Sequence, residues 1–265
     1  MKNIYGYFLK NEAKILANHM RTEGSIVSIN DIKKLISTKA ENKVMEEALG
    51  VTPTDFNMFY NLEDGWSYVF EIEQQDIDLE LITRINSKVS DETNAFPGII
   101  RTKQSIFVPT QKDNYIPDIP MPQAIEQELN DINSIEDPMQ KSMELFTFIA
   151  RSQMFENCNK RTAYLVANVV LVQNDIALLT PVDELNTTFL NILSNYYLDP
   201  TDANKNKVHR FLKENFLFNQ ELDYKRQEQG YHMIYEDDVD GILAERSNCL
   251  SQIKDVDVED QDIEM

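Results

Sequence analysis

The sequence has 265 residues, of which 42% are apolar, and a formal net charge of −20 at pH 7. A chain of this length buries enough apolar surface for one large domain, or for one domain with an appendage. The negative charge argues against nucleic acid and anionic membranes as partners, because both attract cationic surfaces. It suits solubility, or a basic protein partner.

The composition also bears on the cellular compartment. No run of about 18 uncharged apolar residues occurs, so no membrane span is expected. The first sixteen residues lack the apolar core and cleavage site of a signal peptide. The two cysteines, Cys158 and Cys249, are too few for a disulfide framework or a four-ligand zinc site. These features predict a cytoplasmic protein with reduced thiols.

The N-terminal third shows apolar residues at helical spacing. Gly24 interrupts the first helical pattern, and Ser28 or Asn30 can cap the second. The third pattern is aromatic and centres on Trp66. The helices predicted here span residues 4–20, 28–36, 56–72 and 77–90.

The pattern changes in the middle of the chain. Residues 96–111, FPGIIRTKQSIFVPTQ, combine a Pro–Gly pair with near alternation and predict a β-hairpin or flap. Three prolines in residues 114–123 predict a surface connector. Helical spacing then returns, with Asp137 and Pro138 as an N-cap and first-turn pair. The later helices are predicted over residues 123–134, 137–154, 159–174, 182–198 (after Pro181) and 202–218.

These patterns predict an all-α domain of about eight helices with one short β-hairpin flap. The nearly all-apolar segment 159–174 is expected to be its buried central helix. Residues 219–254 are interpreted as a C-terminal extension. Residues 255–265 are rich in acids and predict a disordered tail, either simply solvated or used for docking.

The stretch QMFENCNKRTAY, residues 153–164, joins two of these helices through a polar turn. Together with PGIIRT before it, this stretch resembles the signature of the Fic (Fido) domain, H-P-F-x-[DE]-G-N-[GK]-R-x-x-R. The resemblance implies the Fic helical fold, with its core over residues 91–218 and an N-terminal helical region over residues 1–90. It also implies transfer of AMP from ATP, with Mg²⁺, to protein hydroxyls.

The resemblance assigns roles to particular residues. Glu23 matches the glutamate of an inhibitory helix near residues 19–24, and His19 stands at that motif's Ser or Thr position. The nucleotide would contact Asn159, Lys160 and Arg161, and the flap would begin with Ile100, Arg101 and Thr102.

The chain departs from the signature at five positions, and four of these departures remove groups that carry its chemistry. Gln153 replaces the catalytic histidine, and a carboxamide cannot take up a proton near pH 7. A lost general base costs about 10²- to 10⁴-fold in rate. Asn157 replaces the acid that binds the metal and is a weaker Mg²⁺ ligand. Cys158 replaces a glycine that approaches the phosphates, and Tyr164 replaces the last arginine, the expected partner of Glu23.

Other features of the signature remain. Phe155 is expected to anchor the loop in the core, and the N–H groups that begin the 159–174 helix suit an anion. Another base would have to come from His19, His209 or His232, each of which also fits a structural role. Among these, His19 is the closest to the resembled site.

Three functions fit the sequence. The first is a catalytically impaired pseudoenzyme that acts by binding a protein partner, and the four substitutions favour it. The second is an active nucleotidyl- or phosphotransferase with a non-standard base, and the third is a scaffold that binds no nucleotide. The flap could bind a protein segment by strand addition or simply cover the core. The oligomeric state, the target and the nucleotide stay open.

Overall fold

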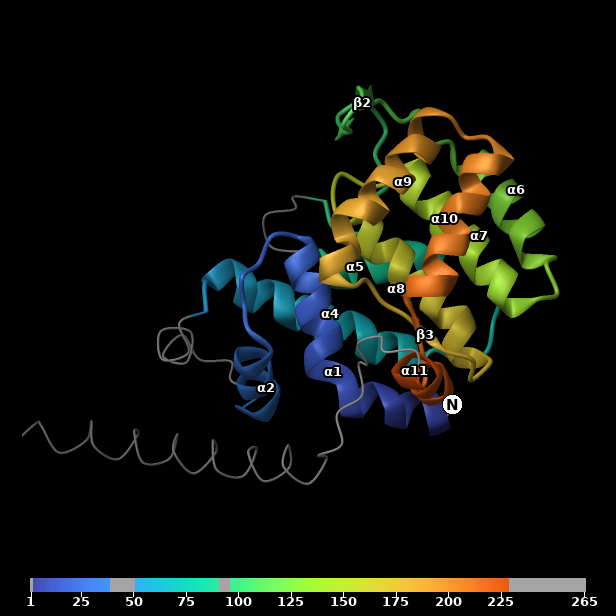
Figure 1. The fold of residues 1–265 in the computed structure, drawn as a ribbon. Helices are drawn as coiled ribbons and strands as arrows, with labels where there is room; N and C mark the ends of the chain where they lie inside the picture. Colours follow the sequence, from blue (N-terminus) through green and yellow to red (C-terminus); the bar gives the residue numbers. More distant parts are fainter. Residues whose placement is uncertain (1, 39–50, 91–95, 229–265) are drawn as a thin grey trace, which may run out of the picture.

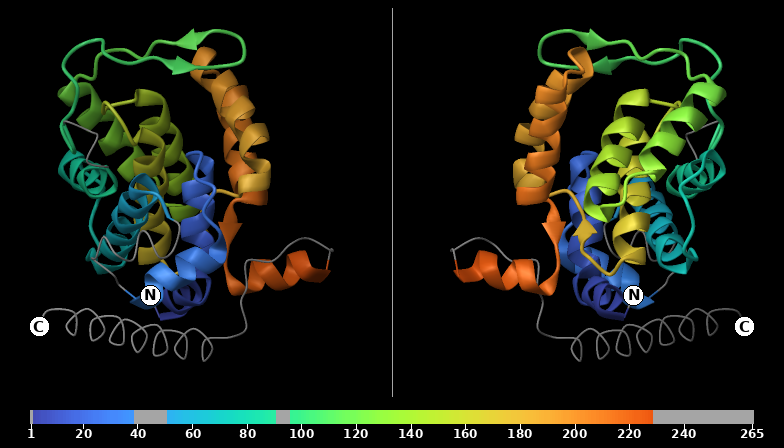
Figure 2. Two further views of the ribbon diagram at one scale, coloured as in Figure 1. Left: turned by 90° about the vertical axis from the view of Figure 1, so that its left-hand side faces the viewer. Right: turned by 90° about the vertical axis from the view of Figure 1, so that its right-hand side faces the viewer.

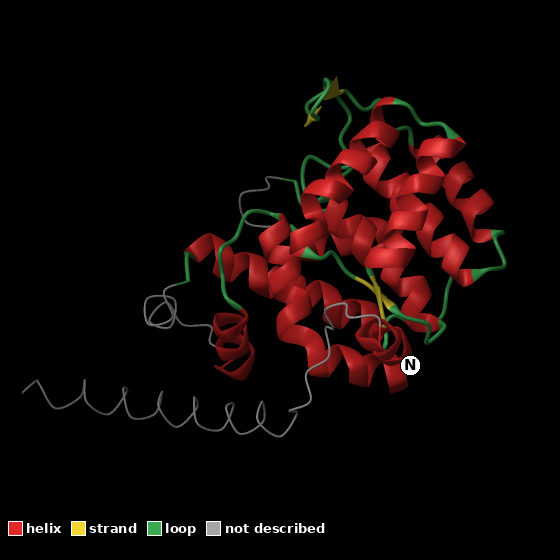
Figure 3. Ribbon diagram, in the orientation of Figure 1, coloured by secondary structure: helices red, strands yellow, loops and turns green. Residues whose placement is uncertain are grey.

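A computed structural model describes residues 2–38, 51–90 and 96–228. Within these ranges, ten α-helices make up most of the structure, and β-structure is confined to two short antiparallel pairs (Figures 1 and 3). The predicted all-α class with a short hairpin is therefore confirmed. The acidic tail, Cys249 and His232 lie outside the described residues. No described helix is long and apolar enough to cross a membrane.

The helices of the N-terminal region begin where the sequence supplies caps. The Thr52 side chain accepts a hydrogen bond from the backbone N–H of Asp55, and Asp78 accepts one from the N–H of Leu81 at 2.7 Å. Such bonds satisfy N–H groups that have no partner within a helix. The four helices are α1 (Lys2–Thr22), α2 (Ile29–Thr38), α4 (Pro53–Glu71) and α5 (Leu79–Val89).

The C-terminal helices follow the predicted order with two differences. The segment predicted as one helix after Pro181 begins with a 3₁₀ turn, Asp183–Leu185, before its α-helix starts. A further helix follows residue 219, where the mixed sequence gave no clear periodicity. The helices are α6 (Pro122–Asn133), α7 (Pro138–Ser152), α8 (Asn159–Gln173), α9 (Asn186–Leu198), α10 (Asp202–Asn215) and α11 (Gln220–Glu228).

Helix α8 is the centre of the core. Its residues from Arg161 to Val172 are all buried, and α4, α5 and α7 pack around it. A helix that is apolar on every side has to be enclosed in this way. Figure 1 shows α1 crossing beside α4, with the α9 and α10 pair on the other side of the molecule. The buried helix predicted over 159–174 therefore has the position expected for it.

The flap is a hairpin of β1 (Val108–Pro109) and β2 (Asn114–Tyr115), in which Val108 pairs with Tyr115. It lies later in the chain than the alternating residues 100–107, which form no strand. The reason is that Arg101 bonds elsewhere, with its N–H donating to the Met154 carbonyl at 3.0 Å. Figure 2 shows the flap reaching over the ends of α9 and α10.

A second antiparallel pair joins two distant segments beside α8. Strand β3 (Leu178–Leu179) pairs with β4 (Leu217–Phe218), and all four side chains are buried. Sequence patterning did not indicate this pair, because two residues are too few to show alternation.

Gly65 marks the closest approach of α4 to its neighbours. A Cβ atom there would lie 2.7 Å from Leu165 Cδ1 and 2.7 Å from Val89 Cγ1. Because overpacking outweighs the gain in helix propensity, we expect Gly65→Ala to lower the free energy of unfolding by about 1–2 kcal/mol. Gly6 in α1 has no atom within 4 Å of such a Cβ, so Gly6→Ala should raise it by up to about 1 kcal/mol. Urea denaturation measures both; equal effects would contradict the packing argument.

Candidate functional site

A cavity of about 300 Å³ lies between the flap, the loop that joins α7 to α8, and α9. The flap contributes apolar residues of segment 106–109, and α9 contributes Leu190, Leu193 and Ser194. Most of the residues singled out in the sequence meet here. Those at the wall are Glu23, Gln153, Asn157, Asn159 and Lys160, and Glu156 joins them.

The loop is shaped by two residues in the left-handed backbone region. Gln153 ends α7 with φ 46°, and Cys158 precedes α8 with φ 64°. This region is comfortable for glycine but costs other residues roughly 1–2 kcal/mol. Cys158 thus adopts the conformation for which the Fic signature has a glycine. Phe155, between them, is fully buried and holds the loop in the core as expected.

The side chain of Gln153 is engaged within the protein. Its Nε2 donates to the Ala150 carbonyl at 2.7 Å, and its Oε1 accepts from Asn159 Nδ2 at 3.2 Å. Only 9% of the residue is exposed. Both ends of the carboxamide therefore have partners, and neither can take up a proton near neutral pH.

Asn159 serves the loop as well as the cavity wall. Its Oδ1 accepts from the Phe155 N–H at 2.9 Å, and its Nδ2 donates to the Phe155 carbonyl at 2.7 Å. This pair of bonds closes the loop from the first turn of α8. The side-chain groups that would meet a phosphate are thus already bonded internally.

Lys160 and Glu23 form an ion pair at the cavity, with Lys160 Nζ 3.3 Å from Glu23 Oε1. Both side chains are about one-quarter exposed. The sequence left Glu23 without its expected partner, since Tyr164 replaces the arginine. The structure supplies Lys160 instead, one turn earlier on α8.

Arg161 and Tyr164 point into the core. Arg161 is 4% exposed, does not line the cavity, and donates from Nη1 to the Val89 carbonyl at 2.9 Å. Tyr164 packs edge-on against His19, with ring centroids 5.3 Å apart. A nucleotide contact from Arg161 stays a prediction, and this geometry does not favour it.

His19 is a core residue and not a substitute base. It is 1% exposed, packs against Tyr164 and Trp66, and does not line the cavity. Burial lowers its pKa to about 3. His209 is likewise buried between α7 and α10, with Nε2 3.1 Å from the Thr147 hydroxyl, and burial lowers its pKa to about 4.

The metal position does not fit Mg²⁺ well. Asn157 is exposed, and its Oδ1 accepts from the Cys158 N–H at 2.7 Å. Nowhere in the described part of the chain do three or more His, Cys, Asp or Glu side chains gather as ligands. Glu156 is the nearest acid in sequence, and its Oε1 accepts from the Ser105 hydroxyl at 2.6 Å.

Arg101 ties the flap to the loop. It is 3% exposed, and its Nε donates to the Gln153 carbonyl at 2.7 Å, while Nη2 donates to the Asp118 carbonyl. Burial lowers the pKa of Arg101 from its ordinary value. Of its flap neighbours, Ile100 packs partly against the core and Thr102 is exposed.

Two residues of the site escaped sequence reasoning. Asn86 on α5 donates from Nδ2 to the Asn157 carbonyl and accepts from the Gly98 N–H at 2.9 Å, so it joins the loop to the start of the flap. Glu156, which precedes Asn157, also lines the cavity. No local pattern marks Asn86, because its partners are distant in sequence.

Comparisons with known proteins agree with this arrangement. A model of the Fic/DOC family matches residues 76–171. A Fic domain containing signalling protein from Bacteroides thetaiotaomicron is similar in structure, with a TM-score of 0.64 and 16% identity; the match covers 89% of this chain and 93% of that one.

A fragment of Fic-1 from C. elegans has a TM-score of 0.59 and 15% identity, over 80% of this chain and 61% of that one. The chain therefore spans about three-fifths of that fragment. At these identities the structures show a shared fold. No curated protein matches the sequence.

The burial of His19 predicts a pH effect on stability. Between its unfolded pKa of 6.5 and its folded value of about 3, the unfolded chain binds one more proton, so stability falls as the pH falls. We expect His19→Phe to remove up to about 1.4 kcal/mol per pH unit of this loss between pH 6 and 4. His209 is present in the wild type and in His19→Phe, so its contribution to the pH dependence of stability is the same in both. Urea denaturation at several pH values tests this, and parallel pH profiles would contradict it.

Proposed function

The chain contains a Fic domain, and we propose that it is a catalytically impaired member that acts by binding a protein segment along its flap. The observation that carries this proposal is the hydrogen bonding of the Gln153 side chain. Its carboxamide is hydrogen-bonded at both ends inside the protein. It stands where the signature has a histidine, and it leaves the cavity without a base at that point. We also infer a cytoplasmic location, as expected from the sequence.

The donors at the cavity support the same conclusion. A triphosphate needs several cationic or N–H donors, and the guanidinium group of arginine, which can donate two parallel hydrogen bonds, is the strongest of them. Arg161 is directed at the Val89 carbonyl, Lys160 is paired with Glu23, and the last arginine is Tyr164. The N–H groups that begin α8 remain for an anion. With Asn157 in place of the metal-binding acid, these residues do not fit ATP with Mg²⁺.

The flap supplies a surface for a protein partner. Phe107 is 61% exposed and Ile116 is 64% exposed, while Val108 and Pro109 pair with β2 along one edge. Among the described residues, β1 has β2 as its one strand partner. An extended segment could therefore add to its other edge through backbone hydrogen bonds, with apolar side chains alongside.

One observation favours the alternative of an active transferase. Glu156 accepts a hydrogen bond from the Ser105 hydroxyl, 2.6 Å away, beside the cavity. A carboxylate that accepts a substrate hydroxyl proton is how protein kinases position their nucleophile. Under this alternative Glu156 would serve as the non-standard base, and Glu156→Gln would abolish transfer.

Label transfer from α- and γ-labelled nucleoside triphosphates, with Mg²⁺ or Mn²⁺, decides between these functions. We expect Gln153→His to stay within about tenfold of the wild type, far below the 10²- to 10⁴-fold that a working base supplies. The reason is that Arg161 and Tyr164 still give no outer phosphate contact. Brisk labelling by Gln153→His would overturn the proposal. Labelling by the wild type that Glu156→Gln abolishes would establish the alternative.

The flap surface is tested by partner retention. We expect Phe107→Asp to lower by about tenfold the amount of partner protein that is cross-linked to the chain and recovered with it. The substitution places a charge on the apolar face of the flap. Leu9→Asp is the matched control, since Leu9 is 45% exposed on α1. Unchanged retention by Phe107→Asp, or an equal loss in Leu9→Asp, would place the binding surface elsewhere.

A further inference from the structure

The cavity beneath the flap has the wrong charge for the ligand that its fold implies. Two carboxylates, Glu23 and Glu156, and one ammonium group, Lys160, line it. Because Lys160 is paired with Glu23, its charge is already balanced. Glu156 bonds to a neutral hydroxyl, and no ion pair neutralises it among the described residues. A polyphosphate entering this cavity would therefore meet an uncompensated carboxylate.

Two nearby positive groups do not reverse this balance. The start of α8 carries a partial charge of about +0.5, less than the full negative charge of the Glu156 carboxylate in the same cavity. Arg101 acts on Glu156 through its charge, but its guanidinium is directed at backbone carbonyls and does not line the cavity. The accessible charge at the wall is negative.

The rest of the wall is apolar and suits an aliphatic stem. Long charged side chains bury their methylene groups against apolar surface while the charged end meets a polar partner. Residues of the flap and of α9 provide such an apolar surface in the same cavity as Glu156. Its members are Ile106, Phe107, Val108, Pro109, Leu190 and Leu193.

We propose that this cavity receives a lysine or arginine side chain of the partner segment, with its cationic end at Glu156. The inference rests on the proposed function, because the flap would hold the backbone of the same segment. It also fits the net charge of −20, which favours basic partners. The site that resembles a nucleotide pocket is then a pocket for a basic residue.

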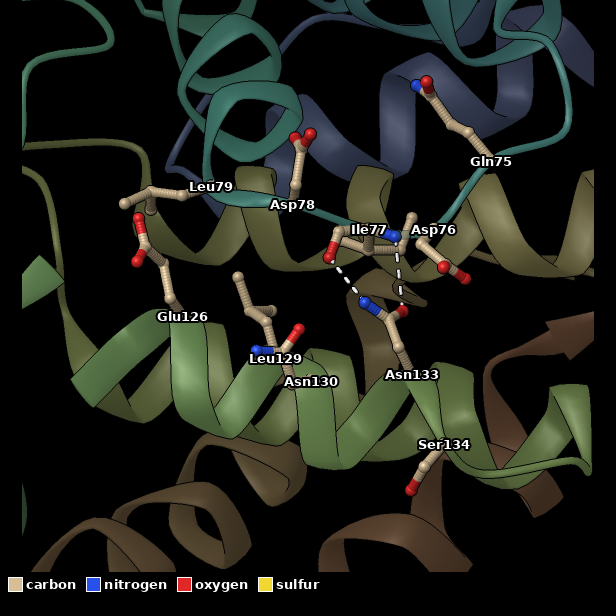
Figure 4. A pocket seen from close by; sticks show the side chains of 10 residues that line it. All are labelled: Gln75, Asp76, Ile77, Asp78, Leu79, Glu126, Leu129, Asn130, Asn133 and Ser134. Atoms are coloured by element: carbon tan, nitrogen blue, oxygen red, sulfur yellow. Dashed lines mark hydrogen bonds between the residues drawn. The ribbon is translucent and has the colours of Figure 1, made fainter. Parts of the chain in front are cut away.

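A larger cavity, of about 550 Å³, is the competing place for a cation. It lies between segment 75–79 and α6, and Asp76, Asp78 and Glu126 line it (Figure 4). Figure 4 shows the Asn133 side chain hydrogen-bonded to the backbone N–H and to the carbonyl of Ile77. These two bonds join segment 75–79 to α6. This cavity is remote from the flap residues, so it offers a matched control.

The test uses small probes in place of the unidentified partner. Nα-acetyl-lysine methylamide and its arginine analogue are titrated while the methyl NMR signals of Ile106, Leu190 and Leu193 are followed. Nα-acetyl-norleucine methylamide has a similar stem without the charge, and ATP with Mg²⁺ is the anionic probe. We expect the lysine probe to bind at least tenfold more tightly than norleucine. Glu156→Gln should weaken it about tenfold, and Glu126→Gln should not change it.

A different result with these small probes overturns the inference. Equal binding of norleucine would show a merely apolar pocket, and tighter binding of ATP with Mg²⁺ would restore the nucleotide interpretation. Changes in the methyl NMR signals of Ile77 and Leu129 on adding the lysine probe would place its binding site in the larger cavity. If Phe107→Asp loses the partner protein but the lysine probe does not bind the wild type, this inference alone is overturned. Lysine binding with retention unchanged in Phe107→Asp would overturn the proposed function and leave the basic-residue pocket standing.

Discussion

The buried guanidinium of Arg101 is the interaction on which the site depends. It donates to the backbone carbonyls of Gln153, Lys103 and Asp118, which lie in three separate segments of the chain. Removing this charged donor leaves the buried Gln153 carbonyl without its partner, which is costly. The flap, the proline connector and the loop before α8 are therefore tied together by this side chain. The cavity lies where the flap and the loop meet α9.

The loop before α8 is stabilised by hydrogen bonds among its own and neighbouring side chains. Asn159 closes it through Phe155, Asn86 holds the Asn157 carbonyl, and Gln153 bonds to Asn159. A site that binds triphosphate has to keep donors available for it, whereas these side chains satisfy one another. The loss of four chemical groups of the Fic signature and this internal bonding belong together. The fold of the loop persists while its groups for phosphate chemistry are lost or engaged.

Sequence reasoning found the helices and most of the cavity wall because these depend on local signals. A nearly all-apolar run located α8, and the Asp137–Pro138 pair marked the start of α7. The missing parts depend on tertiary contacts. The pairing of Glu23 with Lys160 and the role of Asn86 join residues far apart in sequence. The predicted hairpin segment, 96–111, contains β1 but not its partner β2, and Arg101 within it bonds to the loop before α8 and not to a strand.

The backbone of the loop links its shape to the position of the flap. Gln153 and Cys158 both occupy the left-handed region, where residues other than glycine are strained by roughly 1–3 kcal/mol each. Such strain persists when surrounding contacts determine it. Here the left-handed turn at Gln153 presents its carbonyl to Arg101, and the next carbonyl, of Met154, accepts from the Arg101 N–H. A loop relaxed at these positions would release the flap. The strain is thus coupled to the surface that we propose binds the partner.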